Sequence, residues 1–193
     1  MNDKLFEKYI SKKYSGSRLT AYELEAVKSG SIGKLVEAFL GVRDEKMNLQ
    51  LVSAFELMQR YLGERIQMTD FQKIQEITLE NAACQIMDGD RNVLFAIAGS
   101  NEALLNMAGA FAGENFDRLD NDAYDALCEF VNCISGQFAG RLSNLFDSEV
   151  QLHPPVMCEH CRVQAKNDIY VTTFLVDGSL IEMITVCNAT LIQ

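Results

Sequence analysis

Residues 120–146, with the sequence DNDAYDALCEFVNCISGQFAGRLSNLF, contain the clearest structural signal in this chain of 193 residues. Apolar side chains recur there every three or four residues, so a helix would carry them all on one face. Asp120 is well placed as the N-cap of that helix, and Asp122 lies favourably in its first turn. We expect the apolar face to pack on a core through Leu127, Val131, Ile134, Phe138, Leu142 and Leu145.

The opposite face of the predicted helix carries Asp125, Glu129, Asn132 and Gly136. Residues three apart lie side by side on a helix surface, so Glu129 and Asn132 can act together. An asparagine amide cannot serve as a base at neutral pH, but it can hold and orient a water molecule. The glutamate can pair with a cation on a partner. Such a pair suits a hydrolysis in which a second molecule supplies the reactive group. The alternative is an ordinary solvated helix face.

The spacing of these polar residues resembles a known motif. The string Asp125-x-x-x-Glu129-x-x-Asn132 is similar to that of the CheX/CheC/FliY chemotaxis phosphatases, which have Asp or Ser, three residues, Glu, two residues and Asn. Residues 133–136, CISG, resemble the small-residue turn that follows the motif in that family. Residues 152–155, LHPP, resemble its paired-proline strand. The resemblance covers roughly residues 46–193, and the single copy of the motif is like that of CheX.

The resemblance implies a phosphatase that dephosphorylates the phosphoaspartate of a CheY-like response-regulator receiver. On that basis Asn132 would orient the attacking water, and Glu129 would pair with a lysine of the receiver. Asp125 and Gly136 would lie against the partner. No cofactor is expected in this chain, because Mg²⁺ would come with the receiver, and a homodimer is expected. The alternative is a non-catalytic module that binds receivers or belongs to a flagellar switch.

The organisation of the chain is predicted in two parts. Residues 1–44 form a locally basic helical extension of unknown role, and residues 45–193 form the CheX-like phosphatase domain. We expect an α+β fold of two layers, in which helices pack on a mostly antiparallel sheet. Besides the long helix, the predicted elements are helices at 47–62 and 102–111, strands at 77–88 and 92–98 joined by a turn at 88–90, and an extended segment at 150–163 interrupted by two prolines. A second hairpin is predicted, of 169–176 with 180–187 across Asp177 and Gly178.

The composition excludes several classes of function. The net charge is −10, whereas nucleic acids and anionic membranes require a basic surface. No apolar run approaches the length of about 18 residues that would span a membrane, and the N-terminus lacks the apolar core of a signal peptide. The six cysteines therefore predict reduced thiols and a cytoplasmic location.

The cysteines also offer alternatives to the motif. Cys158 and Cys161 have the spacing of a zinc-binding pair, with His153 and His160 nearby, although a closed zinc site requires four ligands. Whether this pair binds metal stays open, and no metal site is predicted. Cys128 has no histidine close in sequence to activate it as a nucleophile. Nucleotide-binding loops of the GxxxxGK[ST] or GxGxxG type do not occur.

Overall fold

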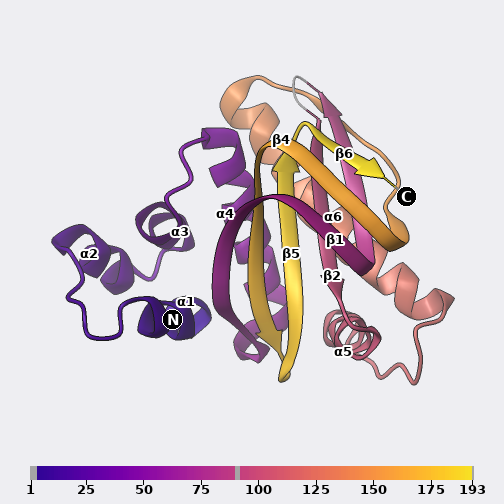
Figure 1. Cartoon of the computed structure of the whole chain (residues 1–193), viewed down its shortest axis with the longest axis horizontal. Coiled ribbons are helices and arrows are strands. Elements are labelled where there is room, and N and C mark those ends of the chain that lie inside the picture. The colour runs from indigo at the N-terminus through magenta and orange to yellow at the C-terminus, as the bar shows by residue number, and fades with distance from the viewer. Residues whose placement is uncertain (1–3, 90–91, 193) are drawn as a thin grey trace.

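The computed structural model describes residues 4–89 and 92–192, and in it helices cover one face of an antiparallel sheet (Figure 1). The predicted α+β class with helices on a mostly antiparallel sheet is therefore confirmed. The helices are α1 (Lys4–Lys13), α2 (Ala21–Ser29), α3 (Ile32–Leu40), α4 (Glu45–Leu62), α5 (Asn101–Ala112) and α6 (Asn121–Phe146), with a short 3₁₀ turn at Gly63–Arg65. The strands are β1 (Ile66–Gly89), β2 (Val93–Gly99), β3 (Val150–Leu152), β4 (Val156–Val176), β5 (Ser179–Cys187) and β6 (Ala189–Ile192).

The two long strands, β1 and β4, give the sheet its shape. Described strands follow the order β3-β1-β2-β5-β4-β6, and β1 also pairs with β4 along most of its length. Between Ile74 and Glu76 the register shifts, so residues 165–168 of β4 lie opposite the single residue Gln75. A bulge of this kind bends a strand pair. The β1–β4 pair accordingly arches across the front of β2 and β5 in Figure 1.

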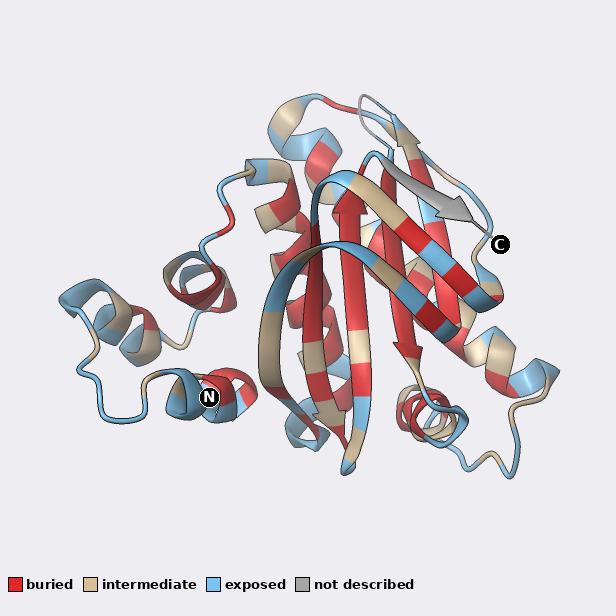
Figure 2. Cartoon of the chain, viewed as in Figure 1, coloured by how far each residue is buried: buried red, intermediate tan, exposed pale blue. Residues whose placement is uncertain are grey.

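This arch explains why the central strands are buried on both faces (Figure 2). On one face, β1 contributes Ala83 and Met87 to the core shared with the helices. On the other face, Ala82 and Cys84 belong to a second apolar cluster, together with residues of β2, β4 and β5. Successive strand residues point to opposite faces, so a strand between two cores loses the polar–apolar alternation. Every residue from Val93 to Ala98 of β2 is buried for this reason.

Helix α6 lies against the sheet and between α4 and α5. It begins as predicted, with Asp120 as N-cap accepting a hydrogen bond from the backbone N–H of Ala123. The guanidinium group of Arg141 on α6 contacts two residues of α4, Ser53 through its Oγ at 3.3 Å and Glu56 through its carboxylate. Facing α5, Phe130 packs edge-on against Phe111 with 5.0 Å between ring centroids. These contacts fix the rotation of α6 about its axis, and with it the direction of its outer face.

The three N-terminal helices lie on the side of the sheet that carries the start of β1 (Figure 1). Helix α1 packs on β1, whereas α2 packs on α3 and α3 on α4. Phe6 of α1 is fully buried, and its ring meets Phe55 of α4 edge-on at 5.5 Å. The Phe55 ring in turn meets Phe174 of β4 at 5.5 Å. The extension therefore shares one continuous apolar core with the rest of the chain. The division at residues 44 and 45 stays a prediction, although α4 does begin there with Asp44 as N-cap.

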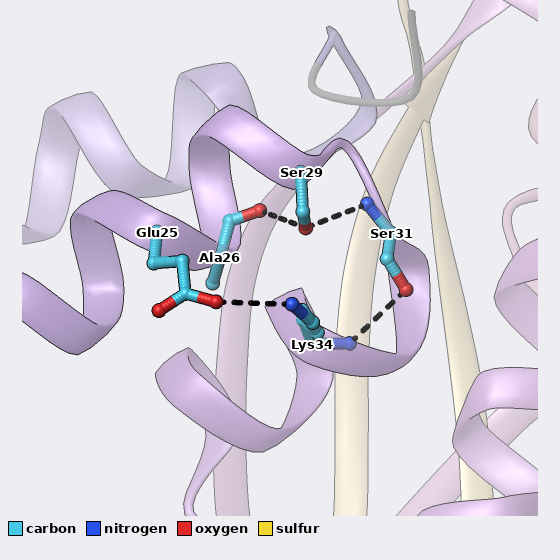
Figure 3. Close-up of polar contacts among 5 residues, drawn as sticks. All are labelled: Glu25, Ala26, Ser29, Ser31 and Lys34. Atoms are coloured by element: carbon cyan, nitrogen blue, oxygen red, sulfur yellow. Dashed lines mark hydrogen bonds and ion pairs between the residues drawn. The ribbon is translucent and has the colours of Figure 1, made fainter.

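The junction of α2 and α3 shows how tightly the extension is built (Figure 3). Ser29 donates through Oγ to the Ala26 carbonyl at 2.7 Å and accepts from the Ser31 N–H at 3.2 Å. Ser31 then caps α3 by accepting from the Lys34 N–H at 3.5 Å, and the Lys34 ammonium group reaches Glu25 at 3.1 Å. Such capping satisfies the free N–H groups at the start of a short helix.

Several expectations were wrong in detail. Strand β1 begins at Ile66, whereas the prediction began it at residue 77. The sequence did not reveal the first half of this strand, because that half carries charged residues on the exposed side of the arch and lacks a clear apolar pattern. The predicted gap between 163 and 169 is part of a continuous β4. Leu145 is 68% exposed, since the last turn of α6 extends beyond Leu142, its last buried residue. The predicted turn between β1 and β2 includes Asp90, which lies outside the described residues, but the antiparallel pairing of the two strands is confirmed.

Candidate functional site

Helix α6 presents three of the four predicted site residues to solvent. Asp125, Glu129 and Gly136 are exposed, whereas Asn132 is half-buried. Asn132 therefore differs from the ordinary solvated helix face that was the alternative for this stretch. Its side chain lies between the helix surface and the sheet, where it contacts a residue of β1. A half-buried amide has fewer orientations than a solvated one, which suits a side chain that must hold another group in place.

The residue beneath Asn132 is Gln85 of β1, which is 1% exposed. Its Nε2 donates a hydrogen bond to Asn132 Oδ1 at 3.1 Å and another to the His153 carbonyl at 2.7 Å. On the outer side, Asn132 Nδ2 donates to Glu129 Oε2 at 3.4 Å. A chain of polar contacts thus runs from the linker between β3 and β4, through the sheet, to the exposed carboxylate. Gln85 and His153 were not predicted as site residues, although a glutamine inside the apolar run 82–87 is a detectable signal.

The proline segment lies next to this chain of contacts. Pro154 and Pro155 fall between β3 and β4, where no ladder hydrogen bonds are needed, as their missing N–H donors predict. The linker is tied to β1 by the His153 N–H, which donates to the Ile86 carbonyl at 3.0 Å. The His153 ring also lies 2.6 Å from an Asp88 carboxylate oxygen. The linker therefore holds the His153 carbonyl steady beneath Gln85.

A thiol on α6, that of Cys133, lies against the carboxylate of Glu129 and is affected by its charge. Cys133 Sγ lies 3.6 Å from Glu129 Oε1. Partial burial raises the pKa of the Cys133 thiol, the Glu129 charge and hydrogen bond raise it further, and a contact with Tyr61 acts in the opposite direction. Burial and the charge of Asp125 likewise raise the pKa of Cys128. Both thiols therefore stay protonated, which does not favour a thiolate nucleophile.

The candidate zinc pair is part of the second apolar cluster. Cys158 and Cys161 are buried there with Cys84. Burial and the neighbouring Cys158 raise the pKa of the Cys161 thiol to about 12. Among residues 4–89 and 92–192, no three His, Cys, Asp or Glu side chains are grouped so that they could hold a metal ion.

The motif does not lie in a small-molecule pocket formed by the adjoining linker. A cavity of about 320 Å³ is lined by residues that include Ile86, Asp88, Asn92, His153 and Pro154. Cys84 and Ile86 face it from β1, whereas Gln85 between them points to α6, so this cavity and Asn132 lie on opposite faces of the strand. An exposed helix that carries its polar residues outward is better suited to meet a macromolecular surface.

Comparisons with known proteins place this part of the chain among chemotaxis proteins in sequence and fold. Residues 82–175 match the family model described as chemotaxis phosphatase CheX, a segment that contains Gln85 and the whole motif. The chain contains a CheX-like domain. No protein with a curated description matches the chain in sequence.

Solved structures show the same fold for this CheX-like domain. The chemotaxis protein CheX from Vibrio vulnificus has a TM-score of 0.61 at 14% identity, covering 75% of this chain and all of that chain (100%). CheX from Desulfovibrio desulfuricans has a TM-score of 0.60 at 16% identity, with coverages of 75% and 100%. A CheX–CheY–BeF₃–Mg²⁺ complex from Borrelia burgdorferi has a TM-score of 0.56 at 18% identity, with coverages of 75% and 99%.

In the part of the chain that is described, no helix is both long and apolar enough to span a membrane.

Proposed function

We propose that the CheX-like domain dephosphorylates the phosphoaspartate of a CheY-like receiver, with Glu129 and Asn132 as its catalytic residues. The observation that carries this proposal is the placement of the two side chains. They lie in contact on an outward-facing helix, within the segment that matches the chemotaxis phosphatase family model. The fold shared with CheX in a CheX–CheY complex supports a receiver as the partner.

The role proposed for Asn132 is to position water. Its amide has two N–H hydrogens and an oxygen with two lone pairs. Glu129 takes one hydrogen and Gln85 takes one lone pair, which leaves one donor and one acceptor position open. An amide held in this way can orient a water for in-line attack on phosphorus. Phosphoryl transfer depends largely on such positioning rather than on covalent chemistry by the protein.

The role proposed for Glu129 is docking. Its carboxylate is exposed, and its contact with Asn132 is long at 3.4 Å, so a cation of the receiver can displace it at little cost. A lysine near the phosphoryl group is the expected partner, and the pair would fix the register of the helix on the receiver. Mg²⁺ would arrive with the receiver and offset charge on the phosphoryl oxygens.

Asp125 and Gly136 extend the proposed contact surface along α6 in both directions. Asp125 lies one turn before Glu129, and Gly136 lies one turn after Asn132. A Cβ added at Gly136 would meet open space within this chain, so the absence of a side chain there is not required by packing. It would allow the receiver to approach closely.

A homodimer remains a further proposal. In this chain α1 packs against β1, so the N-terminal extension covers part of the longest strand. Sedimentation of the full chain at several concentrations would test whether two copies associate when the N-terminal extension is present.

The deciding experiment measures phosphate release from a panel of phosphorylated receivers, with and without the full chain and with the Asn132→Ala variant. Acceleration by the wild type that disappears in the variant supports the phosphatase. Stable binding of a phosphorylated receiver with no acceleration would instead indicate a non-catalytic receiver-binding module.

A further inference from the structure

The strand residue Gln85 occupies an unusual place for a glutamine. It lies in the middle of the buried part of β1, opposite Phe95 of β2. The alternation of side chains along the strand places it on the helix-facing side, with Ala83 and Met87 of the main core as its neighbours on that side. A buried amide is costly unless its polar atoms are hydrogen-bonded. An apolar residue would fill this position at lower cost if packing were its only purpose.

The side-chain amide of Gln85 has partners for its donor nitrogen but none for its acceptor oxygen. Nε2 makes the two bonds to Asn132 and His153, whereas Oε1 is buried and accepts no hydrogen bond within the described residues. A buried acceptor without a partner is destabilising, because it has lost its hydrogen bonds to water. The N–H side of the amide is therefore the part that makes specific contacts, and both of its hydrogens are used.

The polarity of these contacts orients Asn132. A backbone carbonyl only accepts, so the His153 carbonyl requires the nitrogen of Gln85 to face it. The same nitrogen also faces Asn132, which therefore turns its oxygen inward and its nitrogen outward to Glu129. Reversing either amide would bring like atoms together. The direction of the Asn132 amide is thus determined by a backbone carbonyl on a different segment of the chain.

We propose that Gln85 is a positioning residue for the reaction, holding the Asn132 amide in one of its two orientations. The catalytic consequence rests on the function proposed above. Once a cation of the receiver has displaced the contact between Asn132 and Glu129, only Gln85 would keep the Asn132 amide from rotating at its terminal torsion, which is broad and roughly two-fold. Without Gln85, a fraction of encounters would present the wrong atom to the water. Receiver docking through Glu129 would be unaffected, because Gln85 is buried and does not reach the partner.

The test compares Gln85→Met with the control Gln50→Met. Gln50 is a second fully buried glutamine, on α4, and both of its amide atoms lack hydrogen-bond partners in the described structure. The control removes a buried amide without touching Asn132. We expect Gln85→Met to lower kcat about 10-fold with KM unchanged, since loss of precise positioning acts on the chemical step. Gln50→Met should change neither. A folded Gln85→Met variant with unchanged kcat, or with raised KM alone, would overturn the proposal.

A second measurement does not depend on activity. The side-chain amide resonances of Asn132, assigned by their loss in Asn132→Ala, should shift in Gln85→Met, while those of exposed Asn144 on the same helix stay in place. If Gln85→Met fails to fold, cross-peaks between the Gln85 amide protons and the Asn132 β protons in the wild type decide the question, and their absence overturns the proposed contact. If the wild type accelerates no receiver, the catalytic role falls with the proposed function. The resonances then show separately whether Gln85 orients Asn132.

Discussion

Asn132 and Glu129 contact each other one turn apart on α6, with 3.4 Å between Nδ2 and Oε2. The contact joins a half-buried amide to an exposed carboxylate, so one member of the pair is held and the other is free to move. This difference separates their expected roles. Substitution of Asn132 should affect the chemical step, and substitution of Glu129 should affect docking.

The Asn132→Ala variant is predicted to lose phosphatase activity by about 10² or more, as expected for one group that stabilises or positions the transition state. The fold should be retained, because the side chain is only half-buried. The measurement is phosphate release under single-turnover conditions, with circular dichroism to verify folding. Asn144→Ala is the matched control, an exposed asparagine on the same helix. Near-normal activity of Asn132→Ala would contradict the proposed mechanism.

The Glu129→Ala variant is predicted to weaken binding of the receiver roughly fivefold, since an exposed ion pair contributes up to about 1 kcal/mol. Turnover should fall as well where the pair sets the docking register. The affinity of the wild type should decrease as salt concentration rises, and that of the variant should depend less on salt. Titration calorimetry at two salt concentrations measures both effects. Glu114→Gln, which removes an exposed charge from the loop after α5, should leave them unchanged.

Two glycines on α6 allow stability and docking to be separated. Gly136 and Gly140 are both exposed, and a Cβ at either would meet open space. Replacement by alanine should stabilise the chain by about 0.5–1 kcal/mol in each case, because glycine is a poor helix former. Gly136→Leu should weaken receiver binding much more than Gly140→Leu, since Gly140 lies about 12 Å along the helix from Asn132. Equal effects of the two leucine variants on binding would show that Gly136 is not at the interface.

The sequence predicted the elements whose signals are local. The period of the apolar residues and the Asp120 cap located α6, and the Asp177–Gly178 turn located the β4–β5 hairpin. The sequence did not predict the first half of β1, because this half of the strand has one side exposed to solvent and carries charged residues on that side. The contact of Gln85 with Asn132 was missed for a different reason. The two residues are 47 positions apart in sequence, and only the packing of α6 on the sheet brings them together.

The cysteines on α6 provide a pH-dependent test of the site geometry. The charge of Glu129 helps to raise the pKa of Cys133, so Glu129→Gln should lower that pKa while burial keeps it above its ordinary value. More thiolate would then be present near pH 8, and alkylation of Cys133 by iodoacetamide should become faster. Cys128 is the internal control, since its pKa is raised by Asp125 rather than by Glu129.

Peptide mapping after timed alkylation distinguishes the two thiols. Asp125→Asn should accelerate the alkylation of Cys128 and leave the alkylation rate of Cys133 unchanged, which is the reverse of the result expected for Glu129→Gln. If Glu129→Gln left the alkylation of Cys133 unchanged, the carboxylate would not lie against that thiol, and the assigned rotation of the Glu129 side chain would be wrong.

The N-terminal extension is predicted to contribute to the stability of the whole chain. Phe6→Ala should lower the free energy of unfolding by about 3–5 kcal/mol, because the ring is fully buried and its removal leaves a cavity beside Phe55. Since Phe55 also contacts Phe174 of β4, unfolding should remain a single transition in which helical and sheet signals change together. Tyr22→Ala, at a ring that is 50% exposed on α2, should cost much less. Denaturant titration followed by circular dichroism measures both, and a separate early transition in Phe6→Ala would show instead that residues 1–44 fold independently of the CheX-like domain.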